Sequence, residues 1–89
     1  MTESPIIVDN VDRKRFEMNV DGEVAFTQYV RRGNELLLMH TEVPSALRGR
    51  GAGSRLVRGV LDRARAEGAM IVPHCPFVKA FLKKHPEYQ

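Results

Sequence analysis

With 89 residues the chain has the length of one small domain, and we expect residues 1–89 to form a single unit. The single cysteine, Cys75, excludes an intramolecular disulfide, and because the three histidines are scattered we expect no cysteine-based zinc site and no bound metal. The net charge of +3 suits an anionic ligand, and no apolar run approaches the roughly 20 residues of a membrane span.

The first half of the chain is predicted to form strands. Its start, residues 1–5, lacks the basic and apolar regions of a signal peptide, so we expect a cytoplasmic protein. Phe16, Met18 and Val20 alternate with polar residues, which indicates a strand with one buried face. Asp21-Gly22 then favours a type I′ hairpin turn, which needs positive φ twice. The expected strands are a short one at Ile6–Asn10, then Arg15–Val20, Glu23–Val30, and an apolar, central one at Leu36–Val43, covered on both sides.

Helical spacing begins after Pro44. An amphipathic helix is predicted between Ser54, its N-cap, and Gly68, its C-terminal stop. A short buried strand follows at Met70–Val72. The sequence therefore predicts an α+β or α/β fold, a mixed and mostly antiparallel sheet of about five strands with a β-α-β crossover.

A C-terminal helix completes the predicted fold. It begins at Pro76, since proline is favoured at the first helical position, and it ends at His85-Pro86. Phe77 and Phe81 lie at helical spacing, and we expect both in the core.

A glycine-rich loop, Arg48–Ser54, joins the most apolar strand to the amphipathic helix. Gly49, Gly51 and Gly53 allow the backbone to reach positive φ, so several amides can turn toward one point at a helix N-terminus. Two arginines add positive charge, which makes the loop a candidate phosphate site. The alternative is a turn whose glycines only pack the helix close to the sheet.

Two common phosphate-binding motifs do not fit this loop. A Walker A loop requires a lysine before its final Ser or Thr, and none stands there. A dinucleotide fingerprint requires a third small residue and an acidic residue ending the next strand, but Ser54 and Pro73 occupy those places.

The loop instead resembles a third motif. Arg48-Gly49-Arg50-Gly51-Ala52-Gly53 is similar to the Arg/Gln-x-x-Gly-x-Gly/Ala signature of the general N-acetyltransferase (GNAT) superfamily. With His40–Pro44, Val72–Val78 and His85-Pro86, it resembles the short, stand-alone branch of that superfamily, whose members consist almost wholly of the acetyl-CoA-binding half.

The resemblance implies where acetyl-CoA binds. The fourth and fifth strands should splay apart, and backbone groups near Glu42 and Val43 should pair with the pantetheine arm. The pyrophosphate would be held by Arg48, Gly49, Arg50, Gly51, Ala52, Gly53 and Ser54. The chain departs from larger members by lacking long N-terminal helices, which build the acceptor wall, and a tyrosine directly after the fifth strand.

Cys75 occupies the place of that tyrosine and is a candidate catalytic residue. As the expected N-cap of the last helix it lies where unpaired amides favour a thiolate. It is predicted either to protonate the departing thiolate of coenzyme A or to carry the acetyl group itself. The alternative is a small buried apolar residue, the commonest fate of a free cysteine.

His40 and Glu42 are two residues apart, so on a strand they share a face. His40 is a candidate base for the amine, and Glu42 either attracts a cationic acceptor or serves as that base. The alternatives are a core histidine and an edge carboxylate. Lys79, Lys83 and Lys84 are expected to form a solvated helix face, with attraction of coenzyme A phosphates as the second interpretation.

The function expected from the sequence is acetyl-CoA-dependent transfer of acetyl to a primary amine on an unidentified protein or small molecule. The second hypothesis is a non-catalytic acyl-CoA-binding module. A nucleic-acid-binding domain ranks last, because few aromatic residues stand among the basic ones in the strands. The sequence leaves the oligomeric state open.

Overall fold

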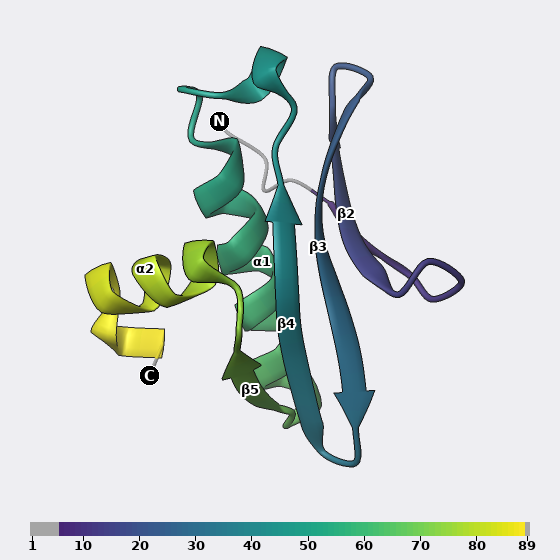
Figure 1. Ribbon diagram of the computed structural model, residues 1–89, viewed down its shortest axis with the longest axis vertical. Coiled ribbons are helices and arrows are strands. Elements are labelled where there is room, and N and C mark those ends of the chain that lie inside the picture. Colours follow the sequence, from purple (N-terminus) through teal and green to yellow (C-terminus); the bar gives the residue numbers. More distant parts are fainter. Residues whose placement is uncertain (1–5, 89) are drawn as a thin grey trace.

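One mixed sheet, with strand order β1-β2-β3-β4-β5, organises the protein (Figure 1). The computed structural model describes residues 6–88, so residues 1–5, on which the expected lack of a signal peptide rests, lie outside the described residues. The strands β1 to β4 are antiparallel, and β5 is parallel to β4 across a helical crossover. This confirms the predicted mixed, mostly antiparallel architecture. The elements are β1 (Ile7–Asn10), β2 (Arg15–Val20), β3 (Glu23–Arg32), β4 (Glu35–Glu42), η1 (Ser45–Leu47), α1 (Ala52–Glu67), β5 (Met70–Pro73), α2 (Pro76–Lys84) and η2 (Pro86–Tyr88).

One face of the sheet is covered by α1, and α2 packs beside α1 (Figure 1). Alternate side chains of β3, those of Ala25, Thr27 and Tyr29, are buried on this face. The apolar stripe of α1, which includes Leu56 and Val60, closes the same core. Complete burial of a Leu or Val side chain contributes about 1.5–3 kcal/mol, so this stripe holds the helix on the sheet.

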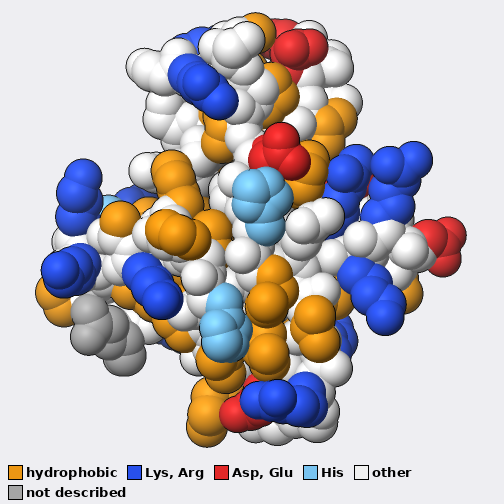
Figure 2. All heavy atoms as spheres, viewed as in Figure 1, with side chains coloured by type: hydrophobic (Ala, Val, Ile, Leu, Met, Phe, Trp, Pro, Cys, Tyr) orange, Lys and Arg blue, Asp and Glu red, His pale blue; other side chains and the backbone are white. Residues whose placement is uncertain are grey.

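The other face of the sheet is open over β3 and β4. Figure 2 shows hydrophobic side chains gathered along its centre, with histidine and charged groups around them. Val30 and Met39 are 44% and 41% exposed. The expectation that Leu36–Val43 is covered on both sides is therefore wrong for the second half of β4, because α1 and α2 both contribute to a single core on the opposite face.

A β-bulge in β4 decides which side chains face that core. Leu38 pairs with Tyr29 and His40 pairs with Gln28, so Met39 is an extra residue with no partner on β3. Strict alternation from the buried Leu38 would direct His40 to the core. The extra residue directs it to the open face.

The predicted turns are confirmed in detail. Asp21 and Gly22 have φ values of 54° and 83°, as a type I′ turn requires. Gly68 adopts the left-handed conformation after α1, and its amide donates to carbonyls of the last turn. β3 continues to Arg32, two residues beyond the predicted end.

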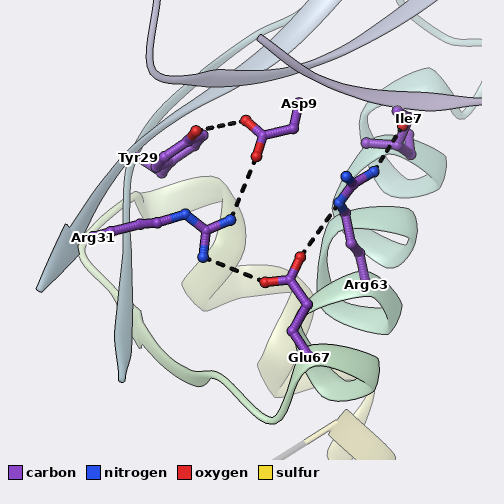
Figure 3. Close-up of polar contacts among 6 residues, drawn as sticks. All are labelled: Ile7, Asp9, Tyr29, Arg31, Arg63 and Glu67. Carbon is purple, nitrogen blue, oxygen red and sulfur yellow. Dashed lines mark hydrogen bonds and ion pairs between the residues drawn. The ribbon is translucent and has the colours of Figure 1, made fainter. Parts of the chain in front are cut away.

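A polar network anchors the C-terminal half of α1 to the sheet (Figure 3). The buried Tyr29 hydroxyl donates to Asp9, while Arg31 forms ion pairs with both Asp9 and Glu67 at 3.4 and 3.3 Å. Burial, followed by the hydrogen bond to Asp9, raises the pKa of Tyr29. Arg63 donates to the carbonyl of Ile7 at 3.2 Å and so joins α1 to β1.

Candidate functional site

The helix α1 begins at Ala52, three residues earlier than the predicted cap at Ser54 implies. Gly51, not Ser54, is the N-cap, and its carbonyl accepts the first helical hydrogen bond from the Arg55 amide at 3.1 Å. Gly51 has φ of 73°, which a residue with a Cβ adopts only with strain. The prediction of a serine cap is therefore wrong, since the left-handed glycine turns the chain into the helix three residues sooner. Ser54 lies within the first turn.

The three glycines of the loop have different structural roles. Gly49 and Gly51 have φ of 78° and 73°, and a Cβ on either would meet nothing within 4 Å. Backbone conformation, rather than space, therefore selects glycine there. A Cβ on Gly53 would lie 2.5 Å from Cζ of Phe77, so this glycine allows α1 and α2 to approach closely. Positive φ therefore explains Gly49 and Gly51, and close packing explains Gly53, so each of the two interpretations of the loop accounts for part of the motif.

These glycines line an open cavity of about 210 Å³, which we call the loop cavity. The first turn of α1 has no acidic residue, and a glycine N-cap offers no side-chain acceptor to its leading amides. The amides of residues 52–54 are therefore available to an anion, and the helix dipole favours negative charge there. The chemistry of these donors fits a diphosphate. The cavity is lined by Val43, Leu47, Arg48, Gly49, Gly51, Ala52, Gly53, Ser54 and Phe77.

The two loop arginines are placed differently. Arg48 lines the loop cavity and its Nε lies 3.4 Å from the carbonyl oxygen of Val43. Arg50 extends toward the β2–β3 hairpin, where its Nη2 lies 3.5 Å from a carboxylate oxygen of Asp21. Both contacts are exposed and weak, so either guanidinium can turn toward an anion at small energetic cost.

The edge of β4 becomes free where β5 ends. The last register pair between the two strands is Leu38 with Pro73, whereas β4 continues to Glu42. The amides of His74 and Cys75 both donate to the Leu38 carbonyl, at 3.0 and 2.9 Å, and the chain then turns into α2. Backbone groups of β4 beyond Leu38 therefore have no strand partner on this edge, and Val43, which follows β4, lines the loop cavity.

Cys75 is the N-cap of α2, as predicted, and its side chain is buried. Its thiol Sγ donates to Oγ1 of Thr41 at 3.4 Å, and that hydroxyl lies 3.0 Å from Oγ1 of Thr27. Thr27 is itself fully buried, so the three side chains form a short polar chain between β3, β4 and α2. The thiol does not line the loop cavity.

His40 and Glu42 lie together on the open face of the sheet. His40 Nε2 is 3.3 Å from a Glu42 carboxylate oxygen, and their side chains are 55% and 60% exposed. His40 is therefore not a core histidine. Because Thr41 points to the opposite face, the structure places Cys75 on one side of β4 and the His40–Glu42 pair on the other.

Sequence reasoning did not identify three residues of this region. Phe77, expected in the core, is 40% exposed and lines the loop cavity, with its ring packed against Gly53 of α1. Thr27 and Thr41 join Cys75 only through the bulged register of β4, which strand alternation alone does not reveal.

The part of the chain that the structure describes holds no group of three or more His, Cys, Asp or Glu residues that could bind a metal ion. Within the same residues, neither helix is long and apolar enough to cross a membrane.

Known proteins share this architecture. Residues 15–89 match the family described as GCN5-related N-acetyl-transferase. Protein NATD1 of Bos taurus and Protein NATD1 of Gallus gallus are each 35% identical to the chain, across 92% of its length and 76% and 78% of theirs. The solution structure of a GCN5-like protein from Staphylococcus aureus matches with a TM-score of 0.73 at 28% identity, over 99% of this chain and 87% of that one. With its free β4 edge and its glycine loop at the start of α1, the chain belongs to the GCN5-related N-acetyltransferase family.

Proposed function

We propose that this protein transfers the acetyl group of acetyl-CoA to a primary amine. The observation that carries the proposal is the loop cavity beside the free edge of β4. Amides at the start of α1, together with Arg48 and Arg50, would bind the pyrophosphate. Backbone groups near Glu42 and Val43 would pair with the pantetheine arm, which contains amides of its own.

The amine acceptor would approach across the open face of the sheet. Acetyl-CoA supplies an activated thioester, and the amine must be neutral to attack it. His40 and Glu42 are exposed on this face and 3.3 Å apart, so either can accept a proton from an ammonium group, directly or through water. The Glu42 carboxylate also attracts a cationic acceptor before that proton is lost.

Cys75 is the group of this chain that would return a proton to the leaving thiolate. Its thiol proton is held by Thr41, whose own hydroxyl can turn to donate to sulfur once that proton has gone. The alternative, a non-catalytic acyl-CoA-binding module, is favoured by the burial of this same thiol, which is 2% exposed. Such a module would bind acyl-CoA through the loop cavity and the β4 edge but would not transfer the acyl group.

Binding is tested first, by titrating the protein with coenzyme A in a calorimeter and following its melting temperature. We expect saturable binding and a rise of Tm, because a ligand that binds the folded state stabilises it. The control is Arg48→Ala, which removes a charge from the loop cavity and should weaken binding about threefold to tenfold. No binding at millimolar coenzyme A would refute both the transferase and the module.

Transfer is tested by incubating the protein with labelled acetyl-CoA and a panel of amines that includes peptides with free N-termini, lysine peptides and polyamines. Release of coenzyme A that depends on one amine class supports the transferase. Binding of coenzyme A without transfer to any amine of the panel would instead favour the non-catalytic module.

A further inference from the structure

An apolar row crosses the open face of the sheet (Figure 2). Val30 of β3 pairs with Leu37 of β4, which in turn pairs with Val72 of β5. None of the three belongs to the core on the opposite face, where Leu36 and Leu38 represent β4. Two exposed methionines adjoin the row, and we call the five residues together the open-face patch: Val30, Leu37, Met39, Met70 and Val72. Apolar surface that the core does not use marks a site of contact with another molecule.

The open-face patch lies beside the His40–Glu42 pair. Gln28 pairs with His40, and Val30 follows Gln28 by two residues on the same face of β3. The apolar row is therefore about 7 Å along the strand from the row that contains His40. An amine at His40 and Glu42 and an apolar group attached to that amine can contact the protein at the same time.

This spacing fits an extended peptide. Side chains on one face of an extended chain repeat about every 7 Å, which is the distance between the two rows. With a free N-terminus at His40, the side chain of the second or third residue of the peptide would lie over Val30 and Met39. These two side chains are 44% and 41% exposed, so the surface is open. A small amine would need a concave site to surround it, whereas a chain of several residues can lie across such a face.

The polar pair favours an α-amino group over a lysine side chain. Glu42 raises the pKa of an ammonium group beside it, because an opposite charge favours the charged form. His40 and Glu42 are 55% and 60% exposed, so the site offers little desolvation to lower that pKa. The acceptor must therefore be an amine that is neutral by its own nature. At pH 7.5 about a quarter of α-amino groups are neutral, against about 0.1% of lysine side chains.

We propose that the acceptor is the free N-terminus of a peptide or protein whose second or third residue is apolar, and that the open-face patch binds that residue. This inference deepens the proposed function and rests on it, because it assumes that acetyl transfer takes place beside His40 and Glu42. It assigns Val30 and Met39 as specificity-determining residues for the acceptor.

The test measures kcat and KM of acetyl transfer to three matched peptides by the wild-type protein. One has a free N-terminus with leucine at its second and third positions, one has serine at both, and one has a blocked N-terminus and a single lysine between leucines. We expect kcat/KM for the leucine peptide to exceed that for the serine peptide about fivefold to tenfold, mainly through KM. It should exceed that for the lysine peptide more than about tenfold.

Variants of the open-face patch show where the leucine is bound. Val30→Ser and Met39→Ser should each reduce the ratio of kcat/KM between the leucine and serine peptides by at least about half, through a higher KM for the leucine peptide. The matched control is Val11→Ser, which removes an apolar side chain that is 66% exposed in the turn between β1 and β2 and should leave the ratio unchanged. The peptide comparison uses the wild-type protein, so it decides the question even where a variant loses stability.

The outcomes separate this inference from the proposed function. Equal kcat/KM for the leucine and serine peptides, or faster transfer to the lysine peptide or to spermidine, would overturn the inference while the proposed transfer stands. Binding of coenzyme A without transfer to any amine would overturn the proposed transfer itself. A dimer in sedimentation that Met39→Glu dissociates would show that a second copy of the chain covers the patch, and would also overturn the inference.

Discussion

Gly51→Ala tests whether the left-handed N-cap of α1 forms the candidate site. The residue has φ of 73° and ψ of 14°, and a Cβ would meet nothing within 4 Å, so the effect is one of backbone conformation alone. A side chain in that conformation costs roughly 1–2 kcal/mol, and the stiffer unfolded chain offsets part of this by about 0.4–1 kcal/mol. We therefore expect a net loss of about 1 kcal/mol, or about 4–8 °C in Tm for a domain of this size.

The assay is urea and thermal unfolding followed by circular dichroism, with the dissociation constant of coenzyme A measured in parallel. Because Gly51 aims the leading amides, we expect weaker binding together with the loss of stability. Gly51→Asn should recover most of both, since Asn tolerates this conformation and is a good N-cap. Ser54→Ala should change stability by less than about 0.5 kcal/mol, because Ser54 is not the cap. A Gly51→Ala protein as stable as the wild type, or a large effect of Ser54→Ala, would refute the reasoning.

Three further variants test the chemistry and the fold. His40→Gln should alter the pH–rate profile of transfer, and an unaltered profile would exclude this residue as the base. Cys75→Ala should lower turnover about 100-fold or more with unchanged coenzyme A affinity if the thiol is the general acid, and unchanged turnover would remove every catalytic role proposed for it. Tyr29→Phe should destabilise the protein by about 1 kcal/mol by deleting the hydrogen bond to Asp9. Because the pKa of Tyr29 is raised on folding, the stability that its protonated hydroxyl contributes should be lost as pH rises above about 10. Urea unfolding at pH 8 and pH 11 should therefore show a smaller fall in the free energy of unfolding for Tyr29→Phe than for the wild type.

Much of the fold could be predicted because its signals are local. The type I′ turn at Asp21-Gly22, the stop at Gly68 and the proline at the start of α2 each reflect a conformational preference of one or two residues. The position of Cys75 as N-cap of α2 follows from the proline beside it in the same way. The loop motif could also be identified from the sequence, since alternate glycines beside two arginines are visible without a structure.

Other features depend on the pairing of distant segments. Ser54 looked like a cap because serine favours that position, but the conformation of Gly51 was not visible in the sequence. Phe77 looked like a core residue by helical spacing, but its ring packs on Gly53 of another helix and stays 40% exposed. The contact of Arg63 with β1 also joins residues far apart in the chain.

Sequence by itself determined the order of the elements, the glycine loop and the candidate residues His40, Glu42 and Cys75, because propensity and spacing act over a few residues. Tertiary structure alone decided which side of β4 each candidate occupies. The bulge at Met39 sends His40 and Glu42 to the open face and turns Thr41 toward Cys75, and a one-residue shift of register exchanges the two faces of a strand. That register depends on the pairing of β4 with β3 and on the burial of Leu36 and Leu38 against α1, which are interactions between segments distant in the chain.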